Sequence, residues 1–167
     1  MNRAIRAIIS SEFRITKNAM RCVGGLVLTL YERASKFLER SAREQEKKSL
    51  SGKEVEHLIR DFTSKIPELC EFEVDPAFPD EIICQWQSTS EIKINRDGRD
   101  HIAQLLHQAT EHLLFCASED AYQNKARKKA KDCVSSGSIK RVLQSNKVLT
   151  LLFPGVTEEK QENSITL

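Results

Sequence analysis

The chain has 167 residues and a formal net charge of +2, from 26 lysines and arginines against 24 aspartates and glutamates. Charged residues make up 30% of it, and only six glycines and four prolines occur, which favours an all-α protein over a sheet-rich one. The apolar run 23–30 is soon followed by Glu32 and Arg33, so the sequence predicts no membrane-spanning helix. Five widely separated cysteines without a CxxC pair predict reduced thiols in an intracellular protein.

The basic residues are grouped rather than spread along the chain. They gather at residues 14–21, 40–53, 93–99 and 125–131, whereas residues 68–81 contain six acids and no base. Most of the basic groups fall at predicted helix ends and loops. We find no paired-carboxylate, nucleophile–base or glycine-rich phosphate motif in a credible context. The grouped charges and the missing catalytic motifs therefore favour a binding scaffold over an enzyme.

In the first half, apolar residues at helical spacing predict a short helix over residues 3–13 and a long helix from Asn18. The long helix should continue for about 26 residues and be roughly 40 Å long. Residues 51–54, with the sequence Ser-Gly-Lys-Glu, form a capping-box pattern that starts a third, short helix. Two short neighbours cannot cover so long a helix, so we expect a second long helix across it.

The same order of elements recurs in the second half. Asp80–Gln87 is predicted to be a short helix, and a polar loop then leads to Asp97 or Asp100, either of which could cap a second long helix. That helix is predicted to run on to about Ala130, and a break at residues 135–138 precedes the last short helix. The chain is therefore predicted to contain two tandem modules of the same design.

Several runs of the sequence match the pattern of one known family. They are Ile15–Met20, Leu30–Arg33 and Ser49–Val55 in the first half, and Ala109-Thr110, Asn124-Lys125 and Ile139–Leu152 in the second. The first three resemble the first loop, the middle of the long helix and the second loop with the third helix of histone 2B. The others are similar, more weakly, to the long helix and third helix of histone 2A. The chain thus resembles a 2B-type histone fused to a 2A-type histone, as in the histone doublets of large double-stranded DNA viruses.

This resemblance implies a particular all-α fold. It consists of two histone folds in tandem, each with a short, a long and a short helix, paired head to tail as an intramolecular histone dimer. Residues 1–75 would form the 2B-like fold, residues 76–156 the 2A-like fold, and residues 157–167 a flexible C-terminal tail. The apolar stripes alone would also fit an unrelated helical bundle.

In the family, the first loop of one fold lies beside the second loop of its partner. Here this would bring residues 14–17 to residues 125–136, and residues 47–49 to residues 93–96. Cations, hydroxyls and helix N-termini in such loops bind phosphates without reading bases. The DNA-binding residues expected from the resemblance are Arg14, Thr16, Lys17, Lys47, Lys48, Ser49, Lys93, Arg96, Lys128, Lys129, Lys131 and Ser135. Each basic loop taken alone could instead be an ordinary solvated surface.

The implied function is that of a structural chromatin protein. It would wrap double-stranded DNA in a nucleosome-like particle with a histone 4–histone 3-type doublet, in the virion and in the host nucleus or viral factory. Docking to that partner is expected at His57, Leu58, Asp61, Phe62, Ile66 and Leu69. The alternative is a histone-fold subunit for protein interaction or transcription, which the low net charge and the acidic start of the second half favour. We expect no cofactor, small-molecule substrate or membrane contact.

The sequence also departs from the family. Positions that match glutamates of the acidic patch of 2A-type histones are His107, His112 and Phe115, so that docking surface is predicted to be missing or rebuilt. His112 and Cys116 are four residues apart, with His101 on nearly the same helical face. No fourth ligand is evident and Cys116 fits the apolar stripe, so we expect no metal site.

Overall fold

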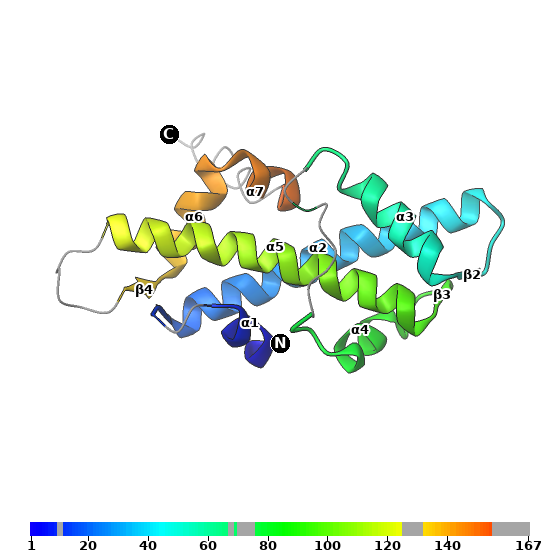
Figure 1. Cartoon of the computed structure of the whole chain (residues 1–167), viewed down its shortest axis with the longest axis horizontal. Helices are drawn as coiled ribbons and strands as arrows, with labels where there is room; N and C mark the ends of the chain where they lie inside the picture. The colour runs from blue at the N-terminus through cyan, green and yellow to red at the C-terminus, as the bar shows by residue number, and fades with distance from the viewer. Residues whose placement is uncertain (10–11, 67–68, 70–75, 125–131, 155–167) are drawn as a thin grey trace, which may run out of the picture.

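The computed structural model of the chain describes residues 1–9, 12–66, 69, 76–124 and 132–154. These residues form seven helices and four two-residue strands (Figure 1), so the predicted all-α class is confirmed. None of the described helices is long and apolar enough to cross a membrane. The predicted tail at residues 157–167 lies outside the described residues.

The elements follow the same order in both halves. The first half contains α1 (Asn2–Ile8), β1 (Arg14–Ile15), α2 (Lys17–Glu44), β2 (Ser49–Leu50) and α3 (Gly52–Phe62). The second half contains α4 (Asp80–Gln87), β3 (Lys93–Ile94), α5 (Arg96–Gln123), β4 (Cys133–Val134), α6 (Ser136–Ser145) and α7 (Lys147–Leu152). Each long helix has 28 residues, which corresponds to about 42 Å.

The prediction of a first helix through Phe13 is wrong. Ile9 has an extended backbone (φ −69°, ψ 137°), so α1 ends at Ile8. Phe13 nevertheless lines the same groove against α5 as Ile8 and Ile9. The position needs an apolar side chain whether or not its backbone is helical, which explains why the spacing resembled that of a longer helix.

The bounds of the second long helix also differ from the prediction. Neither Asp97 nor Asp100 is the N-cap: the side-chain oxygen of Asn95 accepts a hydrogen bond from the Gly98 N–H at 2.9 Å. Asparagine and aspartate are comparable N-caps, so the position of the residue at the helix start decides which one caps the helix. The helix ends at Gln123 rather than near Ala130, and residues 125–131 lie outside the described residues.

The last break is shorter than predicted. Of residues 135–138 only Ser135 lies outside α6, because its hydroxyl accepts a hydrogen bond from the Ser138 N–H at 3.2 Å and caps the helix. Asn146 then separates α6 from α7, and its side chain caps α7 through the N–H groups of Val148 and Leu149. The apolar residues that precede Pro154 therefore form a separate short helix, α7.

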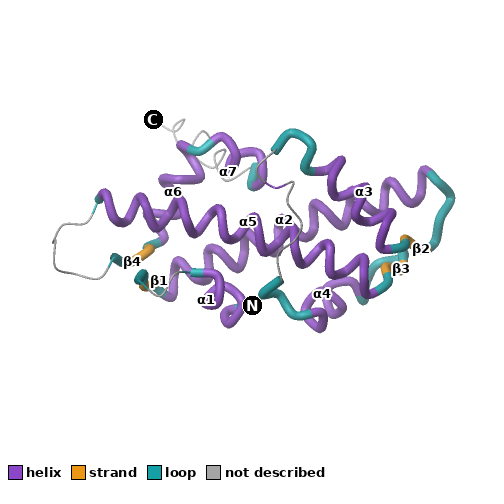
Figure 2. Tube along the Cα trace, in the orientation of Figure 1, coloured by secondary structure: helices purple, strands orange, loops and turns teal. Residues whose placement is uncertain are grey.

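The two long helices run antiparallel across the middle of the molecule. The start of α2 lies beside the end of α5, and the end of α2 lies beside the start of α5, because β1 pairs with β4 and β2 pairs with β3. In Figures 1 and 2, α3, α6 and α7 lie on one side of this pair, and α1 and α4 lie on the other. The buried side chains of both halves form one hydrophobic cluster, which includes Leu30 and Leu38 of α2 and Leu106 and Leu113 of α5.

Two glycines allow α3 and α5 to begin very close together. A Cβ atom on Gly52 would lie 2.7 Å from Cβ of Asp97, and one on Gly98 would lie 2.5 Å from Cγ2 of Ile94 and 2.9 Å from Cγ2 of Val55. Real side chains do not approach so closely in packed interiors. The two halves can therefore meet this closely only because residues 52 and 98 are glycines, which have no side chain.

We predict opposite effects for two glycine-to-alanine substitutions. Gly98→Ala should lower the free energy of unfolding by about 1–3 kcal/mol, because the added methyl group overpacks the junction. Gly25→Ala is the matched control, since nothing lies within 4 Å of a Cβ atom there. It should raise the free energy of unfolding by up to about 1 kcal/mol through helix propensity. Urea denaturation followed by circular dichroism measures both, and equal effects would contradict the packing argument.

Candidate nucleic-acid interface

Each end of the molecule joins one strand from each half. At one end, β1 and β4 are parallel, with Arg14 opposite Cys133 and Ile15 opposite Val134. At the other end, β2 and β3 are parallel, with Ser49 opposite Lys93 (Figure 2). The loops that the resemblance predicts to be neighbours are therefore adjacent at both ends, as far as they lie in the described residues.

Four helices begin beside these strand pairs. Next to β1 and β4, Thr16 caps α2 by accepting a hydrogen bond from the Ala19 N–H at 3.1 Å, and Ser135 caps α6. Next to β2 and β3, Ser51 caps α3 and Asn95 caps α5. A helix N-terminus carries a partial positive charge, so each end presents two of them to an anion.

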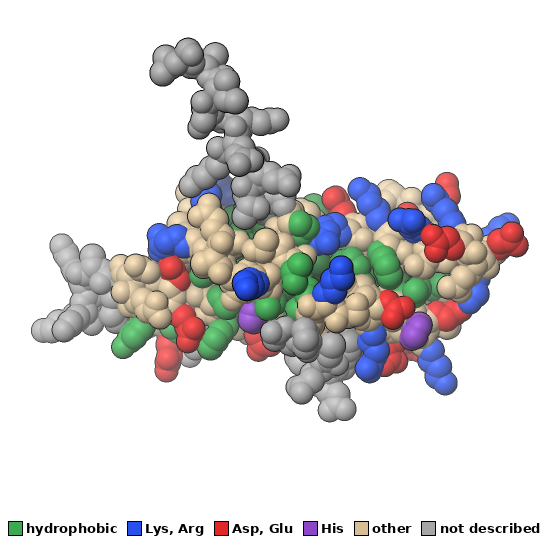
Figure 3. Space-filling model, turned by 90° about the horizontal axis from the view of Figure 1, so that it is seen from above, with side chains coloured by type: hydrophobic (Ala, Val, Ile, Leu, Met, Phe, Trp, Pro, Cys, Tyr) green, Lys and Arg blue, Asp and Glu red, His purple; other side chains and the backbone are tan. Residues whose placement is uncertain are grey.

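The end formed by β2 and β3 carries five of the expected DNA-binding residues. Lys48, Ser49, Lys93 and Arg96 are exposed, and none of these three cations forms an ion pair with a described residue. Lys47 differs, because its ammonium group is bonded to the carboxylate of Glu54. Basic and acidic side chains are interspersed toward this end on the face in Figure 3. Part of the positive charge that the sequence places here is therefore already balanced.

Glu54 fixes this loop to the start of α3. Its carboxylate accepts hydrogen bonds from the backbone N–H and from the hydroxyl of Ser51, both at 2.8 Å, in addition to its bond with Lys47. The bond from Lys47, followed by those from Ser51, lowers the pKa of Glu54 to about 2. Glu54 is thus a carboxylate at neutral pH, and the predicted capping box is confirmed.

We predict an acid-dependent loss of stability from this pair. Because the pKa of Glu54 is about 2 in the folded chain against an ordinary 4.5, its stabilisation is complete above about pH 4.5 and is lost as the pH falls toward 2. The difference in unfolding free energy between the wild type and Glu54→Gln should therefore shrink over that range. Carboxyl NMR should also show that Lys47→Ala raises the Glu54 pKa. A Glu54 pKa near 4.5 in the wild type would contradict this account.

The end formed by β1 and β4 carries four of the expected residues, which are Arg14, Thr16, Lys17 and Ser135. Arg14 and Lys17 are exposed, and neither forms an ion pair with a described residue. The hydroxyls of Thr16 and Ser135 are already used as helix caps. Three further residues of the expected site lie outside the described residues, namely Lys128, Lys129 and Lys131.

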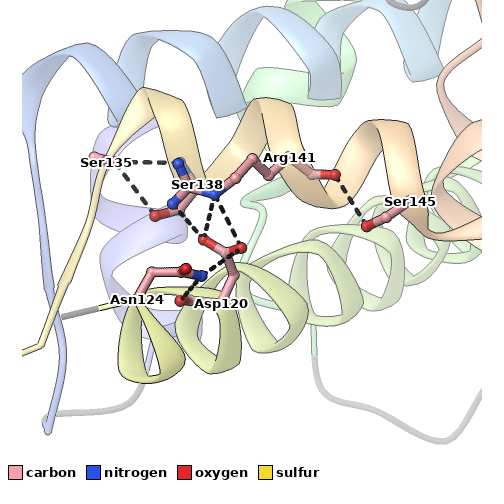
Figure 4. Close-up of polar contacts among 6 residues, drawn as sticks. All are labelled: Asp120, Asn124, Ser135, Ser138, Arg141 and Ser145. Atoms are coloured by element: carbon pink, nitrogen blue, oxygen red, sulfur yellow. Dashed lines mark hydrogen bonds and ion pairs between the residues drawn. The ribbon is translucent and has the colours of Figure 1, made fainter.

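An ion pair that sequence reasoning missed holds α6 to the end of α5 (Figure 4). Arg141 donates to Asp120, with an Nη2–Oδ2 distance of 2.6 Å, and Asn124 donates to the backbone oxygen of Asp120 at 2.9 Å. Arg141 is therefore not available to a phosphate. Its partner is 21 residues away in the sequence, so no local spacing could have indicated the pair.

The start of α4, which lies beside the first turn of α5 near the β2 and β3 end, is less suited to anions. The guanidinium of Arg99 holds Asp80 at the start of α4 through two bonds, Nε–Oδ1 at 2.7 Å and Nη2–Oδ2 at 3.1 Å. The bond from Arg99 lowers the pKa of Asp80, so that carboxyl group stays ionised. With Glu81 also in the first turn, α4 begins with two negative charges.

The residues expected to dock a partner histone are divided between core and surface. Leu58, Ile66 and Leu69 are buried in the core of this chain. Phe62 is half-buried and packs against Phe37, with ring centroids 5.5 Å apart. Only His57 and Asp61 are largely exposed, and they approach each other at 3.7 Å. The surface available to a partner at α3 is therefore smaller than expected.

The positions that match the family's acidic patch have other roles here. His107 accepts a hydrogen bond on Nδ1 from the Ala77 N–H at 3.0 Å. His112 lies 3.9 Å from the Cys116 thiol, and within the described residues no three His, Cys, Asp or Glu side chains are placed to hold a metal ion. Phe115 is 60% exposed. This face therefore presents an aromatic side chain where the family has a carboxylate.

Comparison with known proteins adds no family to this geometry. No protein-family model and no curated protein sequence matches the chain.

Proposed function

We propose that the chain is a structural chromatin protein, a histone doublet with a 2B-like and a 2A-like histone fold, that binds double-stranded DNA without sequence specificity. One observation carries the proposal. Two antiparallel long helices place a strand from each half at both ends of the molecule, and each strand pair is flanked by two capped helix N-termini. Backbone amides, hydroxyls and free cations at such a site suit phosphate oxygens rather than base edges.

The spacing of the two ends supports binding to one duplex. The long helices are 28 residues each, so the strand pairs are separated by about 40 Å. One turn of B-form DNA is about 34–36 Å long. Both ends can therefore contact the same side of a duplex about one turn apart, which is the arrangement that a DNA-wrapping scaffold needs.

The proposed assembly is a nucleosome-like particle with a histone 4–histone 3-type doublet, in the virion and in the host nucleus or viral factory. In this reading the partner approaches the exposed side of α3 near His57 and Asp61, with Phe62 at the edge of the contact. Leu58, Ile66 and Leu69 would support that surface from below, since they are buried.

Reconstitution tests the proposal directly. The chain, a doublet of the 4–3 type and about 120–150 bp of DNA should assemble into a particle that protects a discrete DNA fragment from nuclease. Omission of this chain is the control and should shorten the protected fragment. If no fragment is protected at any salt concentration, the wrapping function is wrong.

We predict that charge reversal at the free cations of the β2 and β3 end weakens DNA binding. Lys48→Glu combined with Lys93→Glu should lower the affinity for a short duplex and reduce the slope of log K against log salt by about 2, because each lost phosphate contact removes about 0.9. Lys36→Glu with Lys65→Glu is the matched control, since both of these lysines are exposed away from the ends. Fluorescence anisotropy measures affinity, and circular dichroism checks helical content.

An unchanged slope in the Lys48/Lys93 variant would remove this end from the binding site. Lys47 is left intact in the experiment because its bond to Glu54 also supports the start of α3. Reversing it would mix a folding effect with a binding effect.

A second candidate function is a histone-fold subunit for protein interaction or transcription, with weak or no DNA wrapping. The internal pairing of Lys47, Arg99 and Arg141 with carboxylates favours it, since these cations do not face a ligand. Stable assembly with a partner, together with no measurable duplex affinity at low salt, would identify this function instead.

A further inference from the structure

A hollow lies between α1 and the start of α2, beside the β1 and β4 pair. Its volume is about 340 Å³, and its lining residues are Asn2, Arg6, Ile15, Lys17, Met20 and Arg21. Three of the six are cations and none is an acid. The lining of the hollow is therefore strongly basic.

The three cations have no counter-charge in the described part of the chain. Arg6, Lys17 and Arg21 form no ion pair with any described residue, although all three are exposed side chains within reach of one hollow. By contrast, Arg99 is bonded to Asp80, and Arg141 to Asp120. Grouped charges of one sign repel each other and raise the local potential, which attracts an anion.

The local structure holds these side chains on one surface. Arg6 lies in the last turn of α1, and Lys17 and Arg21 are four residues apart on the same face of α2. Met20 is buried and Ile15 half-buried, so they form an apolar floor. Two forked guanidinium groups and an ammonium group can surround a ligand with several oxygen acceptors, as a phosphate has.

We propose that this hollow binds a backbone phosphate of DNA and extends the β1 and β4 contact onto α1 and α2. The inference rests on the proposed DNA-binding function, and it adds Arg6 and Arg21 to the residues that carry it. Lys17 connects the two surfaces, because it begins α2 beside β1 and also lines the hollow. A duplex that crosses this end would therefore be held at the strands and again on the side of the first module.

The test is a salt series on duplex binding. Arg6→Ala/Arg21→Ala should reduce the slope of log K against log salt by about 1–2, which is the loss of one or two phosphate contacts. Arg6→Lys/Arg21→Lys keeps the charge and should retain most of the slope. The matched control is Lys36→Ala/Arg40→Ala, which removes two exposed cations from α2 away from the hollow and should leave the slope unchanged.

The outcomes separate this inference from the proposed function. If the wild type and Arg6→Ala/Arg21→Ala bind duplex with the same slope, the hollow does not bind a phosphate, and the strand pairs remain the proposed DNA site. No duplex binding by the wild type at any salt overturns both. A polyglutamate peptide tests whether the hollow binds an acidic protein instead of DNA. If it binds the wild type more tightly than duplex does, and only its affinity falls in the variant, the hollow is a site for an acidic protein and the assignment to DNA is wrong.

Discussion

Two long amphipathic helices, α2 and α5, each carry an apolar stripe that the short helices of the same half cannot cover. They cover each other, and leucines of both halves meet in one hydrophobic cluster. Burial of several large apolar side chains is worth many kcal/mol in total, so the antiparallel arrangement is fixed by the core. The strand pairs at the two ends are a result of this packing. The arrangement of residues at the two exposed ends is therefore set by contacts in the buried core.

Different contacts hold the two ends of the molecule together, and these contacts affect the charge of each end. At the β2 and β3 end, Gly52 and Gly98 permit close backbone approach, while Lys47 is bonded to Glu54. At the β1 and β4 end, Asp120 holds Arg141, but the cations on α1 and α2 remain without a carboxylate partner among the described residues. An ion pair that stabilises a loop also removes a cation from the binding surface. The first end is thus less basic, and the second is better suited to an anion.

The helices could be predicted because their signals are local. The capping box at Ser51 and the limits of α4 follow from a few neighbouring residues, and the structure agrees. One error was the N-cap of α5, where Asn95 and not a nearby aspartate accepts the hydrogen bond. Another was the end of α1, because Phe13 contacts the same groove as Ile8 and Ile9 and so continued the apolar spacing of a helix. The bond between Lys47 and Glu54 and the basic hollow were not predicted. Both depend on how side chains from separate elements meet, and a one-dimensional pattern does not contain that information.

The shared core has a consequence for assembly, because both of its halves belong to one polypeptide. When two such folds are separate chains, their pairing depends on concentration and can be lost on dilution. Here the first half encounters the second at an effective concentration set by the connecting segment, which is typically in the millimolar range for a short link. The pairing therefore has a fixed one-to-one stoichiometry and does not depend on the concentration of the protein. A protein made this way needs no matched supply of two subunits, and its two strand pairs are always present together.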